Sequence, residues 1–226
     1  MDSKMIGFLG VDKYDLILYL SRILYQMHKK VLLIDCSQSK ALTYSIPIPN
    51  QILCEESDSY VISYRGVDFT KNHILTKDLL KRYQEEYDLV IIDFGFNKDH
   101  ELIQNCTHIV LVIDQKLHNW KGLKEVLIPK ECQVFLVLYE IYGCKISLFY
   151  ILEELLIAIP TDNIFEVSQE CVDIKQSIDC QYNDIIRFHR LTKPYERLLY
   201  CLITSLYPDH NPKQKTKAYL KAKNGG

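Results

Sequence analysis

Six short apolar runs constrain the fold of this chain more than any other feature. They are MIGFL (5–9), VLLID (31–35), LVIID (89–93), HIVLVI (108–113), CQVFLVLY (132–139) and, more weakly, LIAIP (156–160). Runs of this length without polar alternation are typical of strands buried on both faces, as in a parallel sheet covered by helices. Residues 14–28 and 75–86, between the runs, have the spacing of amphipathic helices. We therefore predict an α/β fold with a doubly wound, mostly parallel sheet and helices on both faces.

The remaining segments complete one domain. A chain of 226 residues with 48% hydrophobic residues is long enough for one well-covered core and short for two. Residues 60–70 indicate a small hairpin turned at Gly66, and 191–207 a closing amphipathic helix, whereas 163–189 fit no single pattern. We expect one domain over residues 1–207, followed by a flexible lysine-rich tail over 208–226.

Charge and composition exclude several function classes. The formal net charge of −2 gives no excess of cations for binding nucleic acid. The eight cysteines include no C-x-x-C pair, and their spacing from the seven histidines does not match that of a metal site. No apolar stretch reaches the length of a membrane span, and no signal-like segment opens the chain. We expect a cytoplasmic protein whose tail makes at most weak contact with a membrane surface.

Three polar stretches follow predicted strands, where ligands bind in sheets of this kind. They are GVDKYD (10–15), DCSQSK (35–40) and DFGFNKD (93–99). The first lies between a strand and a helix, the place of a phosphate-binding loop, yet it carries two carboxylates and a tyrosine. The question is whether this is a nucleotide site or the remains of one.

The order of these segments resembles a known family. KKVLLID (29–35) and YDLVIID (87–93), with the strand, loop and helix before them, look like the MinD/ParA group of deviant Walker-A P-loop ATPases. The resemblance covers nearly the whole chain. The family loop K-G-G-V-G-K-T-T can be laid on this sequence without a gap, which keeps three of its residues: Gly10, Val11 and Lys13.

The other loop positions depart from the family pattern. Phe8 and Leu9 stand at the signature lysine and first glycine, and Asp12 at the last glycine. A carboxylate beside a triphosphate costs about 1–4 kcal/mol at effective dielectric constants of about 20–80. The threonines are replaced by Tyr14, which cannot supply their Mg²⁺ ligand, and by Asp15. Asp12 or Asp15 can instead occupy the positive end of the helix, so that the chain fills its own anion site.

The resemblance implies a set of remnant nucleotide-binding residues and no catalytic residue. The set is Gly10, Val11, Lys13, Asp35 and Asp93. Asp35 matches the first acid of the family's switch-I region, and Asp93 matches the Walker-B acid, which would hold a metal through water only if Mg-ATP binds. Each also has a structural interpretation, because strands of this fold often end in an acid that forms a turn.

We therefore expect a degenerate ATPase-like protein that needs no cofactor and acts as a scaffold or positioning factor. The TadZ proteins of pilus assembly are a divergent branch of this kind, so pilus or secretion components are the expected partners, with recruitment to the inner face of the membrane. Family members pair face to face, which makes a homodimer a further expectation. The alternative is a weak Mg-ATP-binding switch in which Lys13 and Asp93 still act, and Ser37 or Thr43 approaches the metal.

Overall fold

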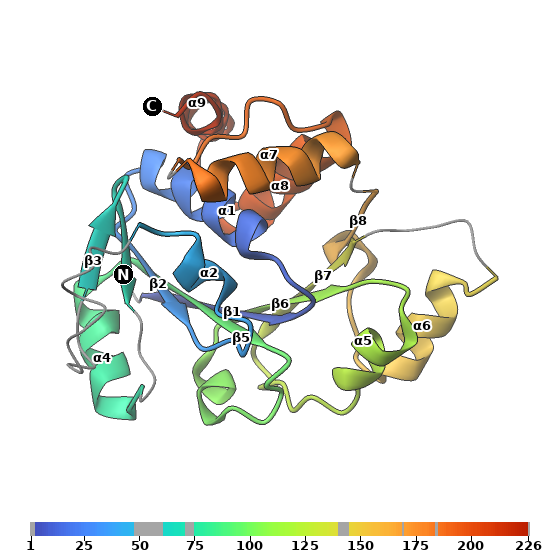
Figure 1. Ribbon diagram of the computed structural model, residues 1–226. Helices are drawn as coiled ribbons and strands as arrows, with labels where there is room; N and C mark the ends of the chain where they lie inside the picture. Colours follow the sequence, from blue (N-terminus) through green and yellow to red (C-terminus); the bar gives the residue numbers. More distant parts are fainter. Residues whose placement is uncertain are drawn as a thin grey trace.

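The computed structural model describes residues 3–47, 61–70, 75–139, 145–168, 170–183 and 185–225. These residues form an eight-stranded sheet in the order β3-β4-β2-β5-β1-β6-β7-β8, between two layers of helices (Figure 1). Every pairing is parallel except that of β3 with β4. The predicted doubly wound, mostly parallel fold is therefore confirmed.

The strands and helices have the following bounds. The strands are β1 Lys4–Gly10, β2 Val31–Asp35, β3 Val61–Tyr64, β4 Val67–Thr70, β5 Leu89–Gly95, β6 His108–Ile113, β7 Gln133–Tyr139 and β8 Ile164–Val167. The helices are α1 Tyr14–Gln26, α2 Ala41–Tyr44, α4 Lys77–Glu86, α5 Leu117–Gly122, α6 Leu148–Leu155, α7 Cys171–Tyr182, α8 Lys193–Leu206 and α9 Pro212–Lys223. Short 3₁₀ turns span Glu101–Asn105 and Thr161–Asn163.

Two apolar cores cover the faces of the sheet, which explains the uninterrupted apolar runs. Along β1, Ile6 and Phe8 point into the core beneath α1, α8 and α9, whereas Met5 and Leu9 point into the core on the side of α4, α5 and α6. Successive side chains of a strand point to opposite faces, so a strand buried on both faces must be apolar at every position.

Two of the smaller sequence predictions have different outcomes. The hairpin over 60–70 is confirmed in its described part, since β3 and β4 pair antiparallel around Gly66, whose φ is +80°. The weak strand over 156–160 is wrong: Leu156 adopts φ +56° and ends α6, and 156–160 runs on without pairing. The last strand is instead β8, which lies in the segment 163–189 that fitted no single pattern. The local sequence did not reveal this strand because its pairing with β7 is a tertiary contact.

The expectation of a flexible tail is also corrected. Residues 212–223 form α9. Asn211 caps its N-terminus, because the side-chain Oδ1 of Asn211 accepts a hydrogen bond from the backbone N–H of Lys213 at 2.9 Å. Ala218 and Ala222 are buried against α1, and small side chains allow two helices to approach closely. The tail is ordered by this packing, which a lysine-rich composition does not reveal.

Candidate functional site

The loop between β1 and α1 is only three residues long. β1 continues to Gly10 and α1 begins at Tyr14. Phe8 and Leu9, which stand at the signature lysine and first glycine, are fully buried strand residues between β5 and β6. Three of the eight positions of the family loop, residues 8–10, are therefore part of the sheet.

Gly10 is required by packing within the sheet. Its φ is +113°, and a Cβ built there would lie 1.9 Å from the carbonyl oxygen of Val112 on β6. The next residue, Val11, donates its backbone N–H to the same oxygen at 2.9 Å. The glycine lets the chain leave β1 tight against β6, so its presence does not need a phosphate to explain it.

Lys13 forms an internal ion pair with Asp93. Its Nζ lies 2.8 Å from Oδ1 of Asp93, and the side chain is 1% exposed. The same ammonium donates to the carbonyl oxygens of Gly10 and Val11, both at 3.2 Å. An ammonium has three donors, and these partners account for all three. Lys13 thus joins the β1–α1 loop to the end of β5.

The first turn of α1 is occupied by the chain's own carboxylates. Asp12 Oδ1 accepts the N–H of Tyr14 at 3.4 Å, and Asp15 Oδ1 accepts the N–H of Leu16 at 2.9 Å. Asp15 is buried, and Tyr195 donates its hydroxyl to Oδ2 of Asp15 at 2.8 Å. Burial, opposed by these hydrogen bonds, raises the pKa of Asp15 to about 6. The predicted filling of this helix terminus by acids agrees with these contacts.

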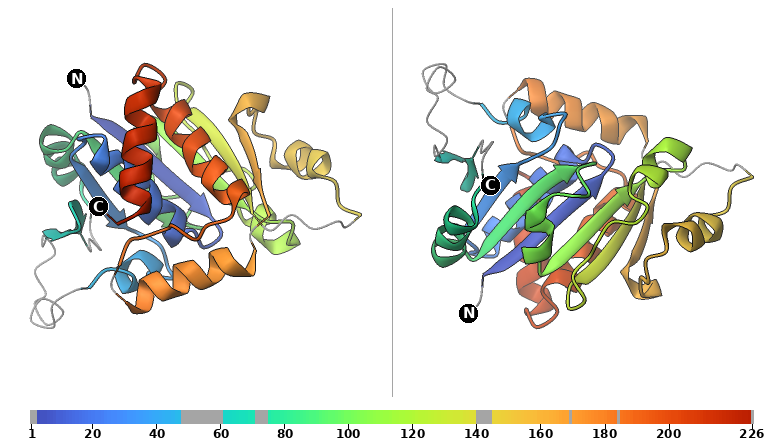
Figure 2. Two further views of the ribbon diagram at one scale, coloured as in Figure 1. Left: turned by 90° about the horizontal axis from the view of Figure 1, so that it is seen from above. Right: turned by 90° about the horizontal axis from the view of Figure 1, so that it is seen from below.

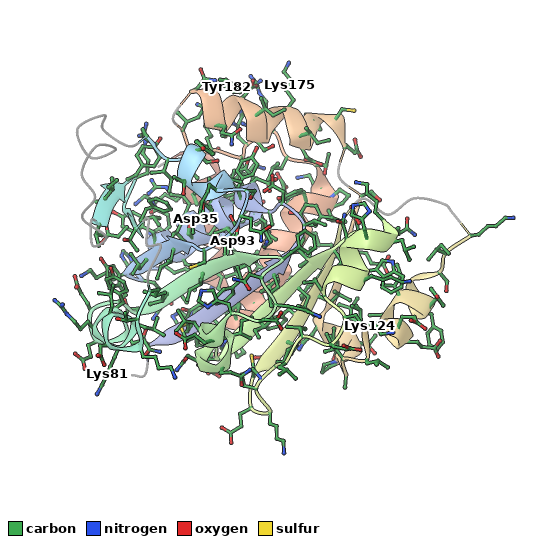
Figure 3. The ribbon with its side chains drawn as sticks, turned by 60° about the horizontal axis from the view of Figure 1, so that its bottom comes forward. Asp35, Lys81, Asp93, Lys124, Lys175 and Tyr182 are labelled. Atoms are coloured by element: carbon green, nitrogen blue, oxygen red, sulfur yellow. The ribbon has the colours of Figure 1, made fainter. Side chains whose placement is uncertain are left out.

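Asp35 and Asp93 lie side by side at the carboxyl ends of β2 and β5 (Figure 3). Asp35 accepts the N–H and hydroxyl of Ser37 at 3.0 and 2.6 Å, and those of Thr43 at 2.9 and 2.8 Å. Asp93 accepts the N–H of Gly95 at 2.9 Å through the oxygen that also meets Lys13. Asp35 thereby closes the turn that leads to α2. The hydroxyls of Ser37 and Thr43, which the alternative of a Mg-ATP switch would bring to the metal, both donate to Asp35.

As folded, these residues do not fit a Mg-triphosphate. The fold brings Gly10, Val11, Lys13, Asp35 and Asp93 to one edge of the sheet. Lys13 is satisfied by Asp93 and by the carbonyl oxygens of Gly10 and Val11, whereas the partners of Asp35 are Ser37 and Thr43. Among the residues described, no cluster of three or more His, Cys, Asp or Glu side chains could hold a metal ion. This arrangement neutralises a buried lysine and joins the ends of β1 and β5.

Sequence reasoning missed two parts of this edge. Asp114 follows β6 and accepts both hydrogen bonds of the Asn119 side-chain amide, at 2.9 and 2.8 Å, while Lys116 pairs with it at 3.1 Å. The run HIVLVID ends in an acid as VLLID and LVIID do, so this signal was available. Tyr195 and Tyr139, whose hydroxyls lie 2.7 Å apart beneath Asp15, come from distant segments and leave no local signal.

Comparison with solved structures identifies the fold. The chain is similar to MinD in the MinC:MinD cell division complex of Aquifex aeolicus, with a TM-score of 0.63, 14% identity, and coverage of 93% of this chain and 98% of that one. It is similar to a ParA family ATPase from Chlorobium tepidum TLS, with a TM-score of 0.55, 12% identity and 98% coverage of both. The third example is pNOB8 ParA bound to nonspecific DNA, with a TM-score of 0.59, 14% identity, and coverage of 92% and 100%.

The likeness lies in the backbone and not in the sequence. No family model matches the sequence, and no curated protein matches it. The chain has the fold of the MinD/ParA P-loop ATPases, which its resemblance to that family implied. In the part of the chain that is described, no helix is long and apolar enough to cross a membrane.

Proposed function

We propose that this protein is a non-hydrolysing relative of the MinD/ParA ATPases that acts as a scaffold or positioning factor and needs no cofactor. The observation that carries the proposal is the ion pair between Lys13 and Asp93, at 2.8 Å in a buried setting. In a working site of this kind, the lysine meets phosphate and the acid acts on the metal. Here each neutralises the other.

The energetics support a closed site. Nucleotide binding would have to separate a buried ion pair, and a buried charge that loses its partner costs about 3–5 kcal/mol. It would also bring phosphate charge towards Asp12 and Asp15 at the helix terminus. The remnant set Gly10, Val11, Lys13, Asp35 and Asp93 would then serve the structure and not a ligand.

The outer face of α7 supports a role in recognition. This helix turns polar side chains inward, including Asp173 and Gln176, and exposes Ile174, Ile178 and Tyr182. Those three residues follow i, i+4, i+8 spacing and so share one stripe. Tyr182 is 84% exposed and projects from the surface in Figure 3. An exposed apolar stripe is a surface on which a protein partner can pack.

The partner class that we propose is a component of pilus or secretion machinery, reached at the inner face of the membrane. A photo-crosslinking residue in place of Ile178, with one in place of Lys81 on α4 as a control, tests this in cells. We expect an adduct with such a component at position 178 only. A self-adduct would favour a homodimer, and no adduct at position 178 would contradict the scaffold.

Calorimetric titration with Mg-ATP and Mg-ADP tests the closed site. We expect no heat of binding at millimolar nucleotide. Saturable binding that persists in Lys175→Ala and disappears in Lys13→Ala would overturn the proposal and favour the alternative, a weak Mg-ATP-binding switch. Lys175 is an exposed lysine on α7, so its replacement controls for the general loss of a positive charge.

A further inference from the structure

The sheet has an open margin at β8. This strand pairs with β7 on one side, and no described strand pairs with its other side. In the left view of Figure 2, β8 lies at one margin of the sheet and α8, in orange-red, runs beside it. A groove of about 570 Å³ is lined by residues of both elements. The groove therefore lies where a further strand would join the sheet.

The outer edge of β8 offers main-chain hydrogen-bonding groups. Successive residues of a strand direct their N–H and C=O groups to opposite sides, so alternate residues of β8 direct theirs away from β7. No described residue makes a hydrogen bond to these outer groups. Ile164 and Phe165 are partly buried, Glu166 is exposed, and all three line the groove. Within Ile164–Val167 there is no lysine, proline or bulge, which are devices that block strand edges.

Helix α8 supplies an apolar wall beside this edge. Pro194 and Leu198 line the groove four residues apart, so they share one face of the helix. Phe165 packs against the core on the same side of the sheet as α8. A strand added to β8 would place alternate side chains against this wall. The wall matters because β8 is only four residues long, so its main-chain hydrogen bonds alone would hold a ligand weakly.

Charges of opposite sign lie on the two sides of the groove. Lys193 and Arg197 line it from α8, whereas Asp162 and Glu166 line it from the strand side. Among the described residues, no ion pair joins the two sides, and Arg197, which is exposed, forms no ion pair at all. The side chains of an extended segment alternate between two faces. One such segment can therefore direct an acid towards Arg197 and a base towards Glu166.

We propose that this groove binds an extended segment of a partner protein, which adds to the sheet beside β8. An extended backbone is the ligand whose donors and acceptors match those of a strand edge. On the face towards α8 the segment would carry apolar side chains and an acid opposite Arg197. A second copy of this chain fits less well, because pairing of β8 about a two-fold axis would bring Lys193 and Arg197 of both copies together. The site is separate from the α7 stripe, so either can fail without the other.

Selection from a displayed library of random linear peptides, against the full chain, tests this site. We expect the enriched peptides to alternate apolar and polar residues and to carry an acid among the apolar ones. A bound peptide should slow the alkylation of Cys201, which lines the groove, and not that of Cys171, which is exposed at the start of α7. Methylation of the peptide's main-chain nitrogens at one set of alternate residues should abolish binding. Methylation at the other set should have little effect, because only one set donates to β8.

A charge reversal tests the contact with α8. Arg197→Glu should weaken binding of an acid-bearing peptide about tenfold, and a lysine in place of the peptide's acid should restore it. Lys175→Glu, on α7, is the matched control and should bind as the wild type does.

Several outcomes would overturn the proposal. It fails if no peptide is enriched, if bound peptides leave the alkylation of Cys201 unchanged, or if both methylated sets bind equally well. It also fails if Arg197→Glu binds the peptides as tightly as Lys175→Glu does. Protection of Cys201 that rises with protein concentration in the absence of peptide would assign the edge to a second copy instead.

Discussion

Replacement of Lys13 by methionine tests whether its ammonium is a structural group. The variant keeps most of the aliphatic stem and removes the charge, which leaves Asp93 buried beside the Gly95 N–H. Removing one partner of a buried ion pair costs about 3–5 kcal/mol of the free energy of unfolding. In a chain of this size, that corresponds to a fall in Tm of about 6–20 °C. A lysine held ready for a ligand would show little effect.

The partner variants separate the ion pair from general packing. Asp93→Asn should destabilise the protein through Lys13, and the double variant Lys13→Met/Asp93→Asn should recover at least about 2 kcal/mol relative to the sum of the single changes. The stability deficit of Lys13→Met should also shrink as the pH falls, because an isolated buried carboxylate takes up a proton.

Urea denaturation at several pH values measures these quantities. Lys81→Met is the control, since Lys81 lies exposed on α4 (Figure 3). Our reasoning about the closed site is refuted if Lys13→Met stays within about 0.5 kcal/mol of the Lys81→Met control. It is also refuted if the two single changes simply add.

Three further predictions concern the surrounding structure. Asp15 has a folded pKa of about 6 against an ordinary value of 3.8, so the folded state holds its proton more tightly and stability falls as pH rises between these values, by about 3 kcal/mol. Asp15→Asn, which disturbs the hydrogen bond from Tyr195 at a cost of about 1 kcal/mol, should therefore be about 2 kcal/mol more stable than the wild type at pH 7.5, and this advantage should vanish near pH 4 in the same denaturation series. Gly10→Ala should prevent normal folding, because its Cβ would meet the Val112 carbonyl at 1.9 Å; a native circular-dichroism spectrum and Tm would contradict this. Truncation before Asn211 should lower Tm by several degrees or more and increase dye binding to exposed apolar surface, since it removes α9 from the core on α1; an unchanged Tm would mean that the helix contributes little.

The sequence determined the layers of this protein. Apolar runs such as 31–35 and 89–93 predict strands buried on both faces, and their alternation with amphipathic segments predicts the doubly wound sheet. The same reasoning places Lys13, Asp35 and Asp93 at one edge, because parallel strands all end there. These predictions depend on local pattern and on the geometry of parallel strands, which the order of residues carries directly.

Tertiary structure alone decided what those residues contact. The Lys13 ammonium lies against Asp93 and not towards solvent. Its position depends on how far β1 continues before α1 begins, and that length cannot be read from the residue types of the loop. The packing of α9 on α1 and the meeting of Tyr195 with Asp15 join segments far apart in the chain. Burial and hydrogen bonding of this kind arise only when distant segments pack, so the sequence determined at which edge these residues lie and the fold determined that Lys13 and Asp93 meet there.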